Sequence, residues 1–596
     1  MGISATMQKS IAIKNLKLMR KKISKLLTLV LFCLFLTGTT TSFAALSAEP
    51  TPGNDPNLIL YYISNSWKIL ERSMNDCNAF SDPKTHITSI LYLPAHFPMP
   101  PSVQKLQQRC HLTVKRLPTI IKKLGDIDGG KIQPPGLLYL PYPYIVPGGM
   151  FNEMYGWDSY FIIRGLIEDK KIKLAHGIVE NFFFEIDHYG GTLNGNRTYY
   201  LTRTQLPFLA PIIRAVYEED KAQNRASLAW LSRAIEYAIK DYNFWTHAPH
   251  LAGKTGLSRY YDLGEGPVSE LDDSAKTYYS DVVRYFLTHP EISQPYLLHS
   301  PNSLQIRPSS SLFTISLCKK SMDKNKDCKL FKNVGLSDLF YKGDRAMRES
   351  GFDVSFRFGP FSADTLAYAP VDLNSLLYKA EIDLAWMSKQ LNRNKEAVVW
   401  QKRAQIRSKK INEYLWNDKR GLYFDYNYMT QQQSENVYAS AFYPLWAGLA
   451  STAQAKKVVD NLSLFEKPGG IVTSLQETGV QWDYPYGWAP IQLIAIEGLY
   501  EYGFADDANR ISHKFLMMVL TNFMREKTIR EKYNVVSCTS QTNIQVGYKL
   551  NVTGFGWTNG VFLVLIHKLP QQIVKTLFGV NQGYAKEPSK NKTLTK

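Results

Sequence analysis

The chain has 596 residues, of which 44% are hydrophobic and 20% are charged. This composition is that of an ordinary globular protein and excludes an intrinsically disordered chain, while the length allows a large core and several domains. The formal net charge of +18 could indicate a nucleic-acid partner, but no nucleic-acid motif accompanies it, so we interpret the charge as solvation.

The first 60 residues predict an export signal and a leader. Residues 1–44 combine a basic beginning, an apolar run over 26–36 and small residues around Ala44. The apolar run is too short for a comfortable transmembrane helix, so we expect cleavage after Ala44 or Ala45 and no stable membrane insertion. An uncleaved signal anchor is the alternative. Residues 45–60 are a proline-rich leader, and the predicted location is the periplasm or outside the cell.

From about residue 60 onward, apolar residues recur with a helical period. Strand-like runs are few and short, such as 421–425, which argues against a parallel α/β fold. The pattern leaves two all-α architectures open, an α-solenoid and a closed ring of helical hairpins. The basic residues 576–596 lack an apolar period and predict a disordered tail. Predicted helices cover residues 175–188, 209–217, 226–245, 372–391, 396–416, 437–449, 454–464, 488–502 and 505–522.

Five cysteines follow the predicted signal. Cys318 and Cys328 could close a short loop, Cys77 and Cys110 could form a second disulfide, and Cys538 would then be unpaired; the sequence leaves this pairing open. The cysteines and histidines have no metal-ligand spacing, so we predict no metal and no cofactor.

Two stretches far apart in the chain carry a Trp-Asp pair among glycine, proline and further aromatic residues. They are residues 147–160 (PGGMFNEMYGWDSY) and 481–490 (QWDYPYGWAP). An indole face stacks on the C–H face of a sugar ring, and a carboxylate accepts hydrogen bonds from sugar hydroxyls. A buried tryptophan beside a capped turn would explain one such stretch. Two of them favour a carbohydrate site.

Both stretches resemble, almost residue for residue, the signature segments of the trehalase family (glycoside hydrolase family 37). The resemblance covers roughly residues 60–570 and implies an (α/α)6 toroid with an N-terminal extension, with the catalytic domain over 61–575. Further blocks that resemble the family, in its order, are residues 194–207, 349–353, 370–374, 531–533 and 554–560.

The resemblance implies an inverting hydrolase that cleaves α,α-trehalose to glucose, with Asp353 as general acid and Glu531 as general base. An inverting pair is about 6.5–9.5 Å apart. Phe352 could desolvate Asp353 and raise its pKa, whereas Arg357 could hold it as a carboxylate. Arg530 and Lys532 flank the base and would favour its charged form if either side chain turns inward.

The same resemblance implies a set of substrate contacts made by aromatic walls and directional polar groups. Trp488 is a further candidate, although it could equally pack a loop. The implied substrate-binding residues are Phe151, Trp157, Asp158, Asn194, Arg203, Gln205, Glu270, Gly351, Trp482 and Trp557.

The chain departs from the family pattern at three places. Met150 and Val268 stand where the family has arginines, which leaves Arg203, with Arg259 a candidate to compensate. The segment 534–548 replaces a glycine-rich loop that contains a glutamate, and should be stiffer. The alternatives are therefore a hydrolase of another small α-glucoside, or a sugar-binding protein with weak or no activity. We expect a monomer with a small-molecule sugar substrate and no nucleic acid.

Overall fold

A computed structural model of the chain describes residues 56–80, 89–270, 273–299, 311–318 and 328–579. The predicted signal at 1–44, most of the leader and most of the tail lie outside these residues. Asn54–Lys596 forms one compact unit. Within the described residues, no helix is long and apolar enough to cross a membrane.

Six helices form the inner wall of a ring. Each packs against the next along the chain, and the last packs against the first, so the ring is closed. Closure excludes an open α-solenoid and makes the fold the (α/α)6 toroid that the family resemblance implied. The inner helices are α4 (Asp158–Glu168), α6 (Leu209–Ala222), α11 (Val371–Gln390), α13 (Tyr443–Trp446), α16 (Ala489–Glu501) and α18 (Gly556–Lys568).

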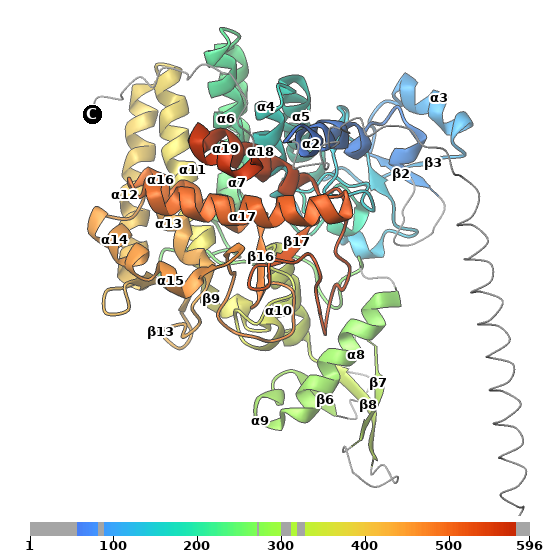
Figure 1. Ribbon diagram of the computed structural model, residues 1–596. Helices are drawn as coiled ribbons and strands as arrows, with labels where there is room; N and C mark the ends of the chain where they lie inside the picture. The colour runs from blue at the N-terminus through green and yellow to red at the C-terminus, as the bar shows by residue number, and fades with distance from the viewer. Residues whose placement is uncertain (1–55, 81–88, 271–272, 300–310, 319–327, 580–596) are drawn as a thin grey trace, which may run out of the picture. The chain divides into compact units, whose positions relative to one another are not determined.

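A second layer of helices covers the inner wall (Figure 1). α16 and α18 are enclosed on nearly all sides, which explains why their sequences are apolar all round rather than amphipathic. The outer helices are α5 (Ile172–Tyr189), α7 (Leu228–Trp245), α12 (Asn394–Tyr414), α14 (Thr452–Asp460), α17 (Ala505–Glu526), α2 (Pro56–Leu70) and α19 (Gln571–Phe578).

The inner helices begin at the same end of the ring as the two Trp-Asp stretches. Trp157 directly precedes α4, Trp488 precedes α16, and Trp557 lies in the first turn of α18. Their side chains contact one another, so these three helix N-termini lie together. The loops that enter the inner helices therefore gather at one place, near the positive ends of the helix dipoles.

The N-terminal region adds a small parallel sheet that the sequence did not predict. β2 (Ile90–Leu93) pairs in parallel with β3 (Thr113–Arg116) and β4 (Leu137–Leu138), and α3 (Pro101–Arg109) forms the crossover. A disulfide joins Cys77, in η1 (Cys77–Ala79), to Cys110. These strands are two to four residues long, too short for their pattern to stand out from the helices.

A second insertion lies between α7 and α11 and has its own apolar core around Val282, Phe286 and Phe340. Its antiparallel sheet has the strand order β6-β8-β7, and the Cys318–Cys328 disulfide joins the paired ends of β7 and β8. Among the described residues, Cys538 is the one free cysteine. The elements of this second insertion are α8 (Asp273–Thr288), α9 (Pro290–Ser293), β6 (Leu297–His299), β7 (Phe313–Cys318), β8 (Cys328–Leu336) and α10 (Asp338–Glu349).

Short elements complete the loops. The predicted helix at 437–449 is two short helices, η7 (Ala439–Phe442) and α13, and that at 454–464 divides into α14 and α15 (Leu462–Phe465). The predicted strand at 421–425 is β11 (Leu422–Tyr423). The others are β1 (Glu71–Arg72), η2 (Gly129–Lys131), β5 (Tyr144–Ile145), η3 (Thr198–Tyr200), η5 (Pro360–Ser362), η6 (Thr365–Ala367), β9 (Tyr368–Ala369), β10 (Trp416–Asn417), β12 (Tyr426–Asn427), β13 (Gln432–Gln433), β14 (Glu466–Lys467), β15 (Gly470–Ile471), β16 (Tyr486–Trp488) and β17 (Lys532–Asn534).

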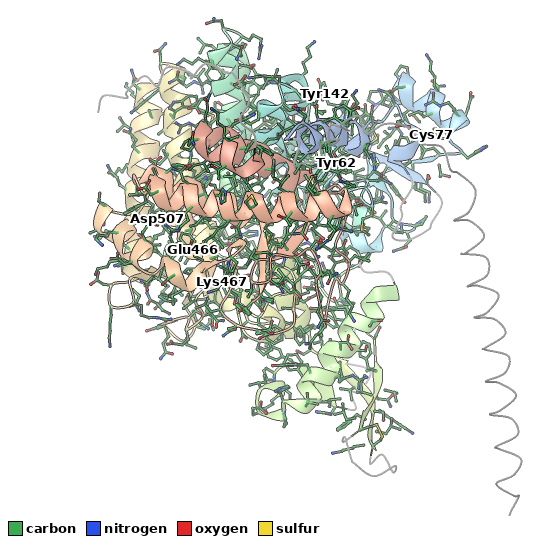
Figure 2. All side chains as sticks on the ribbon, in the orientation of Figure 1. Tyr62, Cys77, Tyr142, Glu466, Lys467 and Asp507 are labelled. Atoms are coloured by element: carbon green, nitrogen blue, oxygen red, sulfur yellow. A yellow bond between two sulfur atoms is a disulfide. The ribbon has the colours of Figure 1, made fainter. Side chains whose placement is uncertain are left out.

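Ion pairs tie the β14 hairpin to the outer helix α17. Glu466 accepts hydrogen bonds from Arg510 at 2.8 Å and from Lys514 at 2.7 Å. Arg510 also pairs with Asp507 at 2.7 Å. Figure 2 labels Glu466 and Asp507. These hydrogen bonds lower the pKa of Glu466 to about 2, although burial opposes the shift.

Candidate active site

The proposed general acid, Asp353, lies in the loop that leaves α10. Gly351 has φ +72°, and a Cβ on it would lie 3.0 Å from the Trp157 ring, so glycine is required there for both backbone and space. Phe352 is fully buried, whereas the Asp353 side chain is 36% exposed. The loop therefore presents this carboxyl to solvent from an otherwise buried segment.

Burial raises the pKa of Asp353 to about 6, against the opposing effects of Arg348 and Arg203. Arg348 Nη1 is 3.7 Å from Asp353 Oδ2. Arg357 is used elsewhere: it binds Asp372 at 2.8 Å and Asp425 at 2.7 Å. Of the two effects that the sequence left open for this carboxyl, desolvation is therefore the one that prevails.

The proposed general base, Glu531, directly precedes β17. Its backbone N–H donates to the Val552 carbonyl at 3.0 Å, and its carbonyl accepts from Trp557 Nε1 at 3.2 Å. Burial raises the pKa of Glu531, and Lys532, whose Nζ is 3.0 Å from Oε2, opposes that shift. Arg530 turns away to Glu526, so only one of the two flanking cations acts on the base as predicted.

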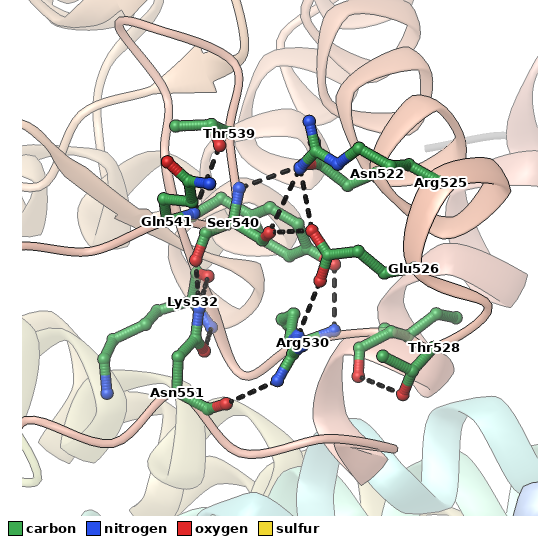
Figure 3. Close-up of polar contacts among 12 residues, drawn as sticks. Asn522, Arg525, Glu526, Thr528, Arg530, Lys532, Thr539, Ser540, Gln541 and Asn551 are labelled. Carbon is green, nitrogen blue, oxygen red and sulfur yellow. Dashed lines mark hydrogen bonds and ion pairs between the residues drawn. The ribbon is translucent and has the colours of Figure 1, made fainter. Parts of the chain in front are cut away.

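A polar network holds the base strand behind the site (Figure 3). Glu526, in the last turn of α17, accepts from Arg530 at 2.8 Å and from Ser540. Asn551 accepts from the Lys532 N–H at 3.2 Å and donates to the Lys532 carbonyl at 2.9 Å. The backbone on both sides of the base is thus fixed by side chains.

The first Trp-Asp stretch joins the acid to the base. Gln205 Oε1 accepts from the Trp157 N–H at 3.1 Å and fixes the start of α4. Asp158 is buried, which raises its pKa well above the usual range, and the charges of Glu531 and Asp353 raise it further. Because Asp158 interacts with both carboxyls, the structure brings the three acids to one place.

The second stretch is fastened to the acid loop. Gln481 Nε2 donates to the Asp353 carbonyl, and the Trp482 N–H donates to the Val354 carbonyl at 3.2 Å. The rings of Trp482 and Trp488 stack at 4.0 Å. β16, which ends at Trp488, pairs with β17 next to the base. The second stretch therefore connects the acid loop to the base strand.

The four tryptophans of the site pack on one another. Trp157 contacts Trp482 at 5.8 Å and Trp557 at 5.5 Å between ring centroids. None of the four, Trp488 included, is more than 4% exposed. This packing applies to Trp488 and equally to Trp157, Trp482 and Trp557, whose contact with the substrate stays a prediction. Phe151 lies at the edge, against the rings of Tyr155 and Phe555.

The polar substrate-binding candidates form a second side of the site. Arg203 binds Glu270 and lies 3.6 Å from Asp262. Burial opposes ionisation of Glu270, but Arg203 and Arg348 together hold its pKa below the usual range. The Asn194 N–H donates to the Arg203 carbonyl at 2.9 Å, which places these two residues side by side.

Sequence reasoning missed Arg348. This side chain is buried, lies over the Tyr278 ring at 5.2 Å, and donates to Asp344 at 3.2 Å. Arg259, the expected substitute, instead binds the carbonyls of Pro249 and Leu366, both at 3.0 Å. The available signal was the position of Arg348 on a helix, four residues after Asp344 and five before the acid.

Two of the departures from the family pattern contact each other. The hydroxyl of Tyr548, in the segment 534–548, donates to Met150 Sδ at 3.1 Å. The segment is also fastened by the Asn543 N–H, which donates to the Tyr486 hydroxyl at 2.8 Å, and by the Gln545 N–H, which donates to the Gly479 carbonyl at 2.8 Å. These bonds favour the expected stiffness, which stays a prediction.

Comparison with known proteins identifies relatives along most of the chain. The family model described as Trehalase matches residues 78–570. The cytosolic neutral trehalase of Kluyveromyces lactis is 35% identical over 459 residues, 72% of this chain and 56% of that protein. The cytosolic neutral trehalase of Saccharomyces cerevisiae is 36% identical over 457 residues, 71% of this chain and 56% of that protein. The solved structure of the S. cerevisiae neutral trehalase has a TM-score of 0.69 and 31% identity, covering 88% of this chain and 96% of that one.

The chain thus spans about half the length of the curated relatives it matches. Their names also correct the predicted location. The names of these relatives describe cytosolic enzymes, which contradicts the predicted export to the periplasm or the medium, so that prediction is wrong.

Proposed function

The chain belongs to the trehalase family, and from that premise we propose that it hydrolyses α,α-trehalose to two molecules of glucose, with inversion at the attacked anomeric carbon. Asp353 acts as general acid and Glu531 as general base. The observation that carries the proposal is a partly exposed aspartate with a pKa raised to about 6, at the same site as a glutamate held against a lysine ammonium.

The reaction needs one proton donor and one proton acceptor. Asp353 gives its proton to the glycosidic oxygen as the bond from that oxygen to the anomeric carbon breaks. Water attacks the same carbon from the opposite face, and Glu531 takes the proton that the water releases. The inverting mechanism requires a separation of about 6.5–9.5 Å between the two carboxyls, which stays a prediction.

The surrounding polar groups support recognition of sugar hydroxyls. Arg203 and Glu270 are already paired, so they present a donor and an acceptor in fixed relative positions. Arg348 adds a cation near Asp353 and Glu270. This is the region in which Val268 stands at a position where the family has an arginine. Arg348 therefore takes the compensating role that the sequence assigned to Arg259.

A second candidate substrate is another small α-glucoside. The observation that favours it is Met150, a family arginine position whose side chain instead accepts a hydrogen bond from Tyr548. A methionine cannot replace the planar, multi-donor bonding of arginine to hydroxyls. Activity on trehalose then depends on Arg203 and Arg348.

The test is glucose release by the purified full-length chain from trehalose and from a panel of α-glucosides. We expect trehalose to be the preferred substrate, and NMR of the initial products to show one α- and one β-glucose, as inversion requires. Release of only α-glucose would contradict the inverting mechanism. Activity on another glucoside alone would support the second candidate, and sugar binding without turnover would contradict both. Light scattering of the same sample would check the predicted monomer.

A further inference from the structure

Lys532 places a fully buried ammonium group against the proposed base. Its side chain has no exposed surface, and Nζ is 3.0 Å from Glu531 Oε2 and 2.7 Å from the Leu550 carbonyl. The ammonium also lies over two aromatic rings, those of Trp488 at 5.1 Å and Tyr548 at 4.6 Å. A buried cation is found in proteins only where such partners compensate its lost hydration.

We propose that Lys532 is the positioning residue of the base: it orients the Glu531 carboxylate, keeps it ionised, and ties it to the segment that closes on Met150. The inference rests on the proposed glycosidase function. Lys532 needs no contact with substrate for this role, because it acts through Glu531.

The backbone geometry makes the lysine a rigid partner. Lys532 is paired with Trp488 across β16 and β17. Asn551 binds both its N–H and its carbonyl, and the Asn551 side chain also donates to the Ser540 carbonyl at 2.7 Å. Figure 3 shows the lysine side chain extending away from the Glu526 cluster. The ammonium is therefore held where it can bind the base and not Glu526.

The lysine also connects the base to the segment that replaces the family's glycine-rich loop. It binds the carbonyl of Leu550, just after that segment, and its ammonium lies over the ring of Tyr548. The Tyr548 hydroxyl in turn binds Met150. A displacement of this segment would therefore change the position of the ammonium, and with it the orientation of the carboxylate.

Several titratable groups face this pair. Glu531 interacts with Lys532, Asp158 and Tyr548, and Lys532 also interacts with Asp353. Burial lowers the pKa of Lys532, while the two carboxylates Glu531 and Asp353 oppose that shift. Without the ammonium, only a hydrogen bond with the Val552 backbone would oppose the effect of burial on the pKa of Glu531, and the base would bind a proton at a higher pH than it does now.

The experiment compares the pH profile of kcat/KM for wild type, Lys532→Met and Lys532→Arg. We expect Lys532→Met to move the acidic limb to higher pH by about one unit or more, and to lower kcat about tenfold or more at the wild-type optimum. Lys532→Arg keeps the charge and should leave the limb near its wild-type position. An acidic limb of Lys532→Met that superimposes on that of wild type would overturn the proposal.

Lys379 offers a matched control. Its ammonium pairs with Asp383 on the inner helix α11 and lies over the Trp446 ring at 5.9 Å, so it has the same kinds of partner away from the site. We expect Lys379→Met to lower stability and to leave the pH profile unchanged. If the acidic limb of Lys379→Met also shifted, the Lys532→Met result would be explained by general destabilisation, and the proposal would be overturned.

A stability measurement separates this inference from the proposed function. If wild type releases no glucose from any α-glucoside, the proposed function fails. The Lys532–Glu531 pairing is then tested by the free energy of unfolding. Lys532→Met should destabilise more in the wild-type background than in Glu531→Gln, because only the former leaves a buried carboxylate unpaired. Equal losses in both backgrounds would contradict the pairing. The same comparison applies if Lys532→Met alone folds poorly. The double variant Lys532→Met, Glu531→Gln should then regain stability, because it no longer buries an unpaired carboxylate.

Discussion

Two carboxyl groups of the toroid, Asp353 beside the site and Glu497 on an inner helix, have opposite pKa shifts. Burial raises the pKa of Asp353 to about 6. Burial opposes ionisation of Glu497 too, but its partners lower the pKa to about 2. The difference between the two regions therefore lies in how completely each carboxylate is paired, and not in burial alone.

Glu497 is surrounded by donors from three other inner helices. Arg164 of α4 lies at 2.7 Å, Trp446 of α13 donates at 3.1 Å, and Lys568 of α18 lies at 3.3 Å. Asp353 has one cation at 3.7 Å, and that arginine already binds Asp344. The ring region uses a carboxylate to join helices, whereas the site leaves one incompletely paired and able to carry a proton near pH 6.

Removing the two proposed proton-transfer groups should have the largest effect on activity. We expect Asp353→Asn and Glu531→Gln each to lower kcat about 10³-fold, the range that general acid–base catalysis provides. Asp241 is the matched control, because burial also raises its pKa to about 6 and its partner is the Thr192 hydroxyl. Asp241→Asn should stay within a few-fold of wild type. Glucose release from trehalose that persists undiminished in both site variants would defeat the assignment.

Removing the charge of Glu497 tests the fully paired carboxylate of the comparison. Glu497→Gln should lower the free energy of unfolding at pH 7 by about 3 kcal/mol, from a pKa shift of about 2.5 units. The lowered pKa stabilises the fold above the unfolded value near 4.5, and this contribution is lost as the pH falls towards about 2. Urea unfolding should therefore show the two curves converging with acid. A constant difference across that range would refute the pairing explanation.

Of the two arginines that oppose the effect of burial on the pKa of Asp353, Arg348 has the larger effect. We expect Arg348→Ala to lower kcat/KM for trehalose about 10- to 100-fold, since a charged hydrogen bond contributes about 1.5–3 kcal/mol. Arg259→Ala removes an arginine that is bound to main-chain carbonyls away from the acid, and should change stability more than kcat/KM. Equal losses of kcat/KM in the two variants would contradict a specific role of Arg348 at the site.

The pH dependence of wild-type activity tests the pKa of the proposed acid. Because a general acid must be protonated, kcat/KM should fall above a pH of about 6, by about tenfold per unit. Arg348 lowers the pKa of Asp353, so the basic limb of an Arg348→Ala variant should lie at higher pH than that of wild type. A limb that moves to lower pH would contradict the electrostatic account of the site.

The smallest expected effect is a gain in stability at the site. Ionising Asp353 is less favourable in the folded chain than in the unfolded one, so this group destabilises the fold increasingly between its unfolded pKa of 3.8 and about 6. Asp353→Asn should therefore raise Tm by about 1–2 °C at pH 7 to 8 and leave it unchanged near pH 4. Calorimetry at the two pH values makes the comparison. A lower Tm at pH 8 would show that the carboxylate stabilises the fold.

The sequence predicted much of the framework because local patterns carried it. The periods over 372–391 and 505–522 became α11 and α17 with ends moved by a few residues. The helix predicted at 437–449 was less accurate, because its apolar residues pack as two short pieces at a turn of the ring. The parallel strands near Ile90 escaped notice, since four buried residues in a row fit a helix as well as a strand.

The site was predictable only in part. The motif blocks led to the proposed acid and base, and to Gly351, which the backbone and Trp157 together require. They gave no signal for Arg348, whose importance comes from Tyr278 and Asp344 in the insertion. Nor could they show that Arg357 faces Asp372 and Asp425 rather than the acid four residues before it.

By itself the sequence determined the helical class, the order of the family blocks and the residues whose type suits acid–base chemistry, because each of these depends on neighbours within a few positions. Only the tertiary structure decided that the ring closes, that the pKa of Asp353 is raised while that of Glu497 is lowered, and that Lys532 turns its ammonium to Glu531. The reason is physical: a pKa depends on burial and on charges within a few ångströms, and some of those neighbours, such as Arg164 beside Glu497, lie hundreds of residues away in the chain.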